Sequence, residues 1–201
     1  MICTDDVLRL HEDTVALWHK EPIANPYDGI LQLICKQHTF NYLLWHEEDI
    51  ARSRDVSDAK IAEVKRNIDG YNQQRNDHIE KVDDWITGWL ISHNVEAPEG
   101  TPINTETPGS VIDRLSIMSL RIYHMIEQTQ RSDVDQQHLE SVNAKLARCH
   151  EQRGDLAHSL SQLLDDIQAG RKCHKTYRQF KMYNDPTLNP YLYDQKLRKA
   201  G

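Results

Sequence analysis

The 201-residue sequence has little phenylalanine, glycine and cysteine, with two, eight and four residues respectively. Such a composition suits an elongated helical protein better than a sheet protein, because a narrow helical bundle exposes much polar surface. The four cysteines are scattered along the chain, and no two lie close together. We therefore expect reduced thiols and exclude a disulfide framework.

Long apolar runs are also absent. No stretch approaches the roughly 20 consecutive apolar residues that a membrane helix needs. Residues 1–9 include Asp5 and Asp6 and lack the basic start of a secretory signal. We therefore expect a cytoplasmic protein without a membrane span.

Charge is distributed unevenly. The net charge is −7, yet residues 170–201 carry eight Lys or Arg and two Asp, a local charge of +6. A basic tail on an acidic body favours an anionic partner or docking onto the body itself, and the alternative is a solvated tail. The overall negative charge disfavours nucleic acid as a partner.

Apolar residues recur at steps of three and four through most of the chain, which is typical of amphipathic helices. We predict one all-α domain: a four-helix bundle of two duplicated antiparallel hairpins joined by a crossover. Its parts are an outer helix (4–20), a first hairpin (28–92), a second hairpin (107–169) and a basic-aromatic tail (170–201).

Capping residues predict where the helices begin and end. The expected helices are Thr4–Lys20 with Thr4 as cap, Asp28–Arg52, one from Asp55 or Ser57 to Ser92, one from Thr107 with Pro108 in the first position, one from Ser132 or Asp133 to Ala169, and a short basic helix Arg171–Tyr183.

An internal repeat supports the duplication. Residues 55–77 match residues 133–155 after a shift of 78 positions, with six identities in 23 positions. Arg75 and Arg153 correspond in this match, and each occupies a position where a bundle helix should carry an apolar side chain. The repeat predicts one buried cation in each hairpin; shared heptad bias is the alternative explanation.

Antiparallel pairing within each hairpin places polar residues at matching levels. We predict a polar layer in the middle of the bundle, made of His38, Asn41, Asn72, Arg75, Asp77, Asp113, Ser116, His150, Arg153 and Asp155.

A buried guanidinium needs an acceptor, because an unpaired buried charge costs several kcal/mol. Asp113 is the best candidate for Arg153, whereas Cys35 occupies the corresponding level opposite Arg75. Either the arginines pair within the protein and fix the helix register, or Arg75 and Arg153 with His38 bind an anionic ligand. In a third alternative, Arg75 extends to solvent. The candidate ligand-binding residues are Arg75, Arg153, His38, Asn41, Asn72 and Asp113.

Recognised catalytic and metal motifs are missing. We find no Glu-x-x-His pair for a di-iron site, no Cys-x-x-Cys or His-x-x-x-His spacing for zinc, and no glycine-rich phosphate loop. Glu47–Asp49 and Glu80–Asp83 suggest a magnesium pyrophosphohydrolase. Antiparallel pairing of their two helices, however, places the two acidic segments roughly 25 Å apart along the bundle axis. We therefore expect no metal and no cofactor.

The tail combines basic and aromatic side chains. We expect it to dock onto the bundle or onto a partner protein, and nucleic acid is a weaker alternative. The candidate partner-binding residues are Arg171, Lys175, Tyr177, Phe180, Lys181 and Tyr183.

Four stretches, His38–Arg52, Asn72–Asp77, Glu106–Ile117 and Lys181–Pro186, together resemble the bacterial domain-of-unknown-function family 4254. The resemblance implies a helical protein of bacterial origin, associated with genes for surface-polysaccharide synthesis, and it implies no reaction. It marks as motif positions His38, Asn41, Trp45, Asn72, Arg75, Asn76, Asp113 and Arg114.

We therefore expect a non-catalytic bundle protein that binds a protein partner, in surface-polysaccharide synthesis as the resemblance suggests. The alternative is an enzyme or binding protein for a phosphorylated small molecule, such as a nucleotide sugar or sugar phosphate, at the arginine layer. An open polar pocket at Arg75 or Arg153 would favour the alternative. The heptad pattern also permits a homodimer.

Overall fold

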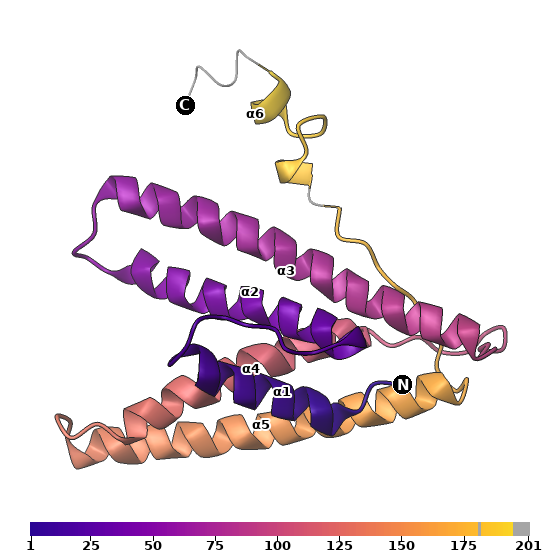
Figure 1. The fold of residues 1–201 in the computed structure, drawn as a ribbon, viewed down its shortest axis with the longest axis horizontal. Helices are drawn as coiled ribbons and strands as arrows, with labels where there is room; N and C mark the ends of the chain where they lie inside the picture. Colours follow the sequence, from indigo (N-terminus) through magenta and orange to yellow (C-terminus); the bar gives the residue numbers. More distant parts are fainter. Residues whose placement is uncertain (181, 195–201) are drawn as a thin grey trace.

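The computed structural model describes residues 1–180 and 182–194 and has an all-α fold (Figure 1). The helices are α1 (Thr4–Trp18), α2 (Gly29–Arg52), α3 (Asp58–Ser92), α4 (Pro108–Thr129), α5 (Gln136–Gln168), a 3₁₀ turn η1 (Met182–Asn184) and α6 (Pro190–Tyr193). The predicted fold class is confirmed. The helices α2 and α3 form one long hairpin, and α4 and α5 form the second; whether they arose by duplication stays a prediction. None of the helices described combines the length and the apolar content needed to cross a membrane.

A single hydrophobic core joins the two hairpins in the middle of the molecule. Its fully buried side chains come from every long helix and include Val7 of α1, Ile34 of α2, Ile86 of α3, Ile112 of α4 and Leu160 of α5. These residues occupy the apolar stripe of each helix, and their burial is the main favourable contribution to packing the hairpins together.

Toward the two turns, the hairpins no longer share one core. Figure 1 shows both turns at the same end of the molecule, with the hairpins diverging toward them. Each hairpin has its own small apolar cluster there, consisting of Leu44, Val64 and Ile68 in the first hairpin and Met118, Ile122 and Cys149 in the second. The surfaces between the hairpins at this end are therefore available for polar groups.

The helix α1 belongs to the core, and the expected outer position differs from the structure. It packs against α2, α4 and α5, and its buried side chains are Thr4, Val7, Leu10, His11, Thr14, Val15 and Trp18. Thr4 does not cap the helix as predicted. Cys3 precedes α1 without a side-chain cap, and Ser161 Oγ donates a hydrogen bond of 2.9 Å to Thr4 Oγ1.

Side-chain caps explain where the other long helices begin. Ser57 Oγ accepts from the Lys60 amide, and Thr107 Oγ1 accepts from the Ser110 amide with Pro108 at the first position. Asp135, rather than Ser132 or Asp133, caps α5. The predicted start of that helix was therefore early by a few residues.

Gly109 allows α4 to approach α3 closely. Gly109 lies at the start of α4, and its amide donates a hydrogen bond of 2.8 Å to Oδ1 of Asp83, a buried residue of α3. A Cβ atom at this position would lie 2.7 Å from the Ile79 carbonyl oxygen and 2.9 Å from Asp83 Cγ. The approach therefore requires glycine.

We expect Gly109→Ala to lower the free energy of unfolding by about 1–3 kcal/mol, because neither the carbonyl group nor the buried carboxylate can move aside freely. Urea denaturation measures the change. Gly154→Ala on α5 is the matched control, since nothing lies within 4 Å of its added Cβ, and we expect it to be neutral or to stabilise by up to about 1 kcal/mol. Equal losses in the two variants would contradict the close approach.

The tail runs along α3 as an extended chain, so the predicted basic helix Arg171–Tyr183 is wrong. The Cys173 amide donates to the Pro102 carbonyl oxygen, and His174 Nε2 lies 3.0 Å from the Asp83 carbonyl oxygen. Arg178 binds Glu80 and Asp84 of α3. The extended tail thus forms hydrogen bonds and ion pairs with the acidic body instead of the backbone hydrogen bonds of a helix.

Candidate functional site

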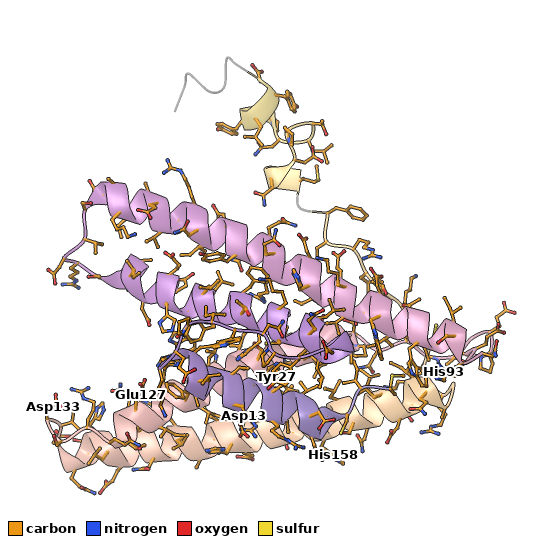
Figure 2. The ribbon with its side chains drawn as sticks, viewed as in Figure 1. Asp13, Tyr27, His93, Glu127, Asp133 and His158 are labelled. Carbon is orange, nitrogen blue, oxygen red and sulfur yellow. The ribbon has the colours of Figure 1, made fainter. Side chains whose placement is uncertain are left out.

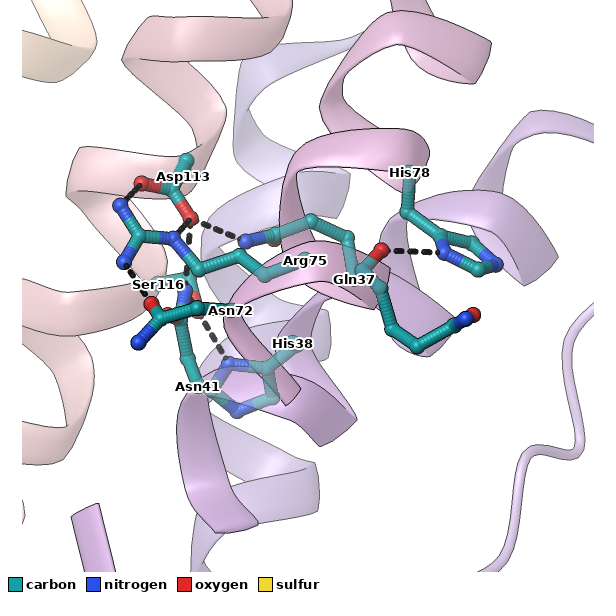
Figure 3. A network of polar contacts seen from close by, with 9 residues as sticks. Gln37, His38, Asn41, Asn72, Arg75, His78, Asp113 and Ser116 are labelled. Carbon is teal, nitrogen blue, oxygen red and sulfur yellow. Dashed lines mark hydrogen bonds and ion pairs between the residues drawn. The ribbon is translucent and has the colours of Figure 1, made fainter. Parts of the chain in front are cut away.

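Asp113 of α4 is the centre of a buried polar network that joins the two hairpins (Figure 3). Arg75 of α3 donates from Nε to Oδ1 and from Nη2 to Oδ2, each at 2.9 Å. Asn41 of α2 donates to Oδ1 at 2.9 Å, and Gln37 Nε2 donates to the same oxygen. The two-nitrogen contact of an arginine with a carboxylate is the strongest geometry for such a pair.

The network continues from Asn41 to Ser116 and His38. Asn41 Nδ2 also donates to Ser116 Oγ at 2.8 Å, and His38 Nδ1 lies 2.6 Å from the same oxygen (Figure 3). Because Asn41 supplies a donor, the hydroxyl hydrogen of Ser116 is left for Nδ1 of a neutral His38. The side chains form one continuous chain of hydrogen bonds from α3 through α4 to α2.

Two fully buried histidines lie side by side behind this chain. The ring of His11 is centred 4.6 Å from that of His38, and Trp18 stacks on His38 at 5.2 Å. Burial lowers the pKa of His38 to about 3, and it lowers the pKa of His11 well below its ordinary value. Both imidazoles are therefore neutral at pH 7.

The predicted pairing of the two arginines is wrong. Asp113 binds Arg75, whereas Arg153 binds Glu12 of α1. The level argument considered only helices within one hairpin, but Asp113 faces the opposite hairpin and Arg153 faces α1. The two arginines occupy corresponding places in the repeat and have different surroundings.

The structure brings together six residues of the predicted layer: His38, Asn41, Asn72, Arg75, Asp113 and Ser116. Four others lie elsewhere. Asp77 accepts a hydrogen bond from Gln73, Arg153 contacts α1, and His150 and Asp155 are exposed. The prediction had placed these four residues in the layer by assuming that the polar residues of both hairpins lie at the same height along the bundle axis.

Sequence reasoning missed Gln37 and Glu12. Gln37 lies four residues before Asn41, on the same face of α2, and that spacing could have identified it. The role of Glu12 carried no such signal, because α1 had been placed outside the bundle.

An open cavity of about 340 Å³ reaches the network between the hairpins. Its lining residues are Asn41, Leu44, Trp45, Glu48, Asp49, Arg52, Asn72, Arg75, Ile117 and Leu120. The Arg75 side chain is 27% exposed, whereas that of Asp113 is 5% exposed. The guanidinium is thus held by the buried carboxylate behind it and is accessible from the cavity in front.

Arg75 has donor capacity left on its cavity side. Nε and Nη2 contact Asp113, while Nη1 makes a single long contact of 3.4 Å with Asn72 Oδ1. A guanidinium carries five N–H groups. Arg52 adds a second cation to the lining, where it pairs with Glu48, and Trp45 adds an aromatic surface.

Neighbouring hollows extend this cleft. One of about 300 Å³ shares Trp45 and Asp49 with the first and adds Arg121 and His124. Another of about 550 Å³ lies between α4 and α5 and includes Arg114 and Arg121. The ionisable side chains that line the cavity at Arg75 are Arg75 itself, Arg52, Glu48 and Asp49.

Some candidate residues of the tail contact other side chains of the protein, whereas others are exposed to solvent. Arg171 Nε donates to Asp166 at 2.7 Å, and Lys175 Nζ lies 5.6 Å from the centre of the exposed Tyr177 ring. Phe180 is 84% exposed. Lys181 and the side chain of Tyr183 lie outside what the structure describes.

The comparison with known families matches residues 31–176, a range that begins in α2, ends in the tail and contains the whole Asp113 network. No curated protein and no solved structure matches the chain. Because the family match covers most of the sequence, the chain belongs to the family described as "Protein of unknown function (DUF4254)".

Proposed function

We propose that the cleft between the hairpins binds a small phosphorylated molecule, with a nucleotide sugar or a sugar phosphate as the class that suits it best. The observation that carries this proposal is the open cavity at Arg75, where a guanidinium is fixed from behind and retains donors in front. Fixed, partly desolvated donors of this kind bind phosphate oxygens well.

The remaining lining supports an amphipathic ligand. A volume of about 340 Å³ falls within the range of small-molecule sites. Trp45 and Ile117 offer apolar surface to a base or sugar ring, and Arg52 provides a second charge. The carboxylates of Glu48 and Asp49 suit hydroxyl groups, and they disfavour a ligand that is anionic along its whole length.

We expect UDP-glucose to raise the melting temperature of the full chain in a thermal-shift assay, and inorganic phosphate to raise it less. Ligand at 100 times its dissociation constant stabilises the folded state by about 2.7 kcal/mol. For a chain of this size, that corresponds to roughly 5–10 °C. Glucose 1-phosphate tests whether the nucleoside is needed.

Two variants and one control make the test specific. Arg75→Lys keeps a charge but loses the two-nitrogen contact with Asp113, so we expect the shift to disappear. Because that change also loosens the fold, Arg52→Gln provides an independent test at an exposed residue of the lining. Arg148→Gln, in an exposed pair with Glu151 on α5, should leave the shift unchanged. A flat wild-type response, or equal responses in all variants, would exclude the cleft as the binding site.

As a second candidate, we propose that the tail binds a protein partner. Exposed apolar side chains support this, since Phe180, Met182, Tyr191 and Tyr193 are all more than half exposed. A cytoplasmic location, bacterial origin and a role in surface-polysaccharide synthesis belong to this proposal. The test is photo-crosslinking from position 180, with position 140 on exposed α5 as control, followed by binding of the purified crosslinked protein to the purified chain. Absence of such binding would refute it.

A further inference from the structure

Three histidines from distant parts of the chain converge beside the cleft. His19 follows the end of α1, His46 belongs to α2 and His124 belongs to α4. One ring nitrogen of each lies within 4.8 Å of one ring nitrogen of each of the others. All three side chains are partly buried.

Each ring has a buried nitrogen without a hydrogen-bond partner. The Nε2 atoms of His19, His46 and His124 are shielded from solvent, and none has a partner among the residues that the structure describes. Buried polar atoms are normally satisfied, so unsatisfied ones need an explanation. Three in one place indicate a group that the protein chain itself does not supply.

The opposite nitrogens of two rings are already engaged. His19 Nδ1 lies 2.7 Å from the Val15 carbonyl oxygen, and His124 Nδ1 lies 2.7 Å from Glu127 Oε2. Figure 2 labels Glu127 on α4, near the turn between α4 and α5. Because a carbonyl and a carboxylate accept, both Nδ1 atoms carry hydrogen, and in the neutral form of each ring the Nε2 atom presents a lone pair. Histidines that bind metals are oriented in the same way, by a carbonyl or carboxylate behind the ring.

Lone pairs facing one another repel unless a cation or a donor lies between them. The rings are held by aromatic neighbours, with Tyr123 stacked on His19 at 4.1 Å and Trp45 stacked on His124 at 4.9 Å.

We propose that His19, His46 and His124 bind a divalent transition metal ion, with zinc as the ion that suits three imidazoles best. Zinc–nitrogen bonds of about 2.0–2.1 Å bring tetrahedral ligands to roughly 3.4 Å of one another. The rings would therefore close slightly around the ion. Three protein ligands leave one position for water or a small anion.

The site adjoins the cleft without depending on it. His124 also lines the hollow of about 300 Å³ that shares Trp45 and Asp49 with the cavity at Arg75. Binding of a metal at the histidines and binding of a phosphorylated ligand at Arg75 use different side chains. Each can fail in experiment without affecting the other.

Our expectation of no metal site considered ligand spacing along the chain only. His19 and His124 are more than 100 positions apart, and no spacing rule for a single helix or loop connects them. The convergence depends on α1 lying between the hairpins, which the sequence did not indicate.

The test is zinc binding by the full chain, first stripped with a chelator and then titrated with Zn²⁺ against a chromophoric competitor. We expect one tight site per chain. His46→Ala should abolish it, and Glu127→Gln, which weakens the acceptor behind His124, should reduce affinity by about 10–100-fold. His158→Ala changes an exposed histidine on α5 and should have no effect (Figure 2).

X-ray absorption of the zinc-loaded wild-type chain avoids substitution altogether. Three imidazole nitrogens with a fourth light ligand, and no sulfur, would support the site. Sulfur ligation, or the same affinity in wild type and His46→Ala, would overturn it. Circular dichroism of each variant checks that a loss of binding does not reflect a loss of fold.

Discussion

We expect Asp113→Ala to lower the free energy of unfolding by about 3–5 kcal/mol, the largest effect of any single substitution considered. Removing one partner of a buried ion pair leaves the other charge uncompensated. Here the change also leaves the buried donors of Gln37 and Asn41 without their shared acceptor. Urea denaturation followed by circular dichroism measures the change.

An exposed ion pair provides the control. Glu106→Ala removes the partner of Arg114, where both side chains are more than 40% exposed, and we expect a cost below about 1 kcal/mol. A double-mutant cycle on Arg75→Ala and Asp113→Ala should give a coupling energy of about 1–3 kcal/mol. A coupling near zero would mean that the pair does not connect the hairpins energetically.

The second large effect is a loss of stability in acid caused by His38 and His11. In the unfolded chain each histidine has a pKa near 6.5. In the folded protein, burial lowers the pKa of His38 to about 3 and that of His11 well below its ordinary value. The unfolded chain therefore binds more protons between those values. The stabilising contribution is complete above pH 6.5 and decreases as the pH falls toward 3.

Within that window His38 should remove about 1.4 kcal/mol per pH unit, and His11 acts in the same direction. Between pH 7.5 and 4.5, His38 alone accounts for roughly 2.7 kcal/mol. We expect His38→Gln to flatten the dependence of unfolding free energy on pH by this amount, whatever it does to stability at pH 7. His150→Gln at an exposed site should leave the slope unchanged. An unchanged slope in His38→Gln would show that His38 is not held neutral in the folded protein.

The long helices and several residues of the polar layer could be predicted from the local sequence. Apolar residues at steps of three and four predicted the long helices, and Ser57 and Thr107 marked two helix starts, because periodicity and capping depend on neighbouring residues. The level argument also identified Asn41, Asn72, Arg75, Asp113 and Ser116 as members of one polar layer. Their position in the middle of long amphipathic helices was enough for that.

The local sequence could not predict which side chains of different helices contact one another. Asp113 was predicted to face Arg153 and instead contacts Arg75, because the partner of a side chain depends on how one hairpin is rotated and shifted against the other. That rotation is set by the packing of side chains such as Ile34, Ile112 and Leu160 in the shared core, where the helix surfaces fit in few ways.

The sequence by itself thus determined the helices, the two hairpins and most members of the polar layer. These features follow from the spacing of residues along each helix and from the short segments that connect successive helices. Only the tertiary structure decided that α1 lies within the core, that Arg75 faces an open cavity, and that His19, His46 and His124 meet. These features depend on distances between helices far apart in the chain, and such distances are fixed by the packing of the whole molecule.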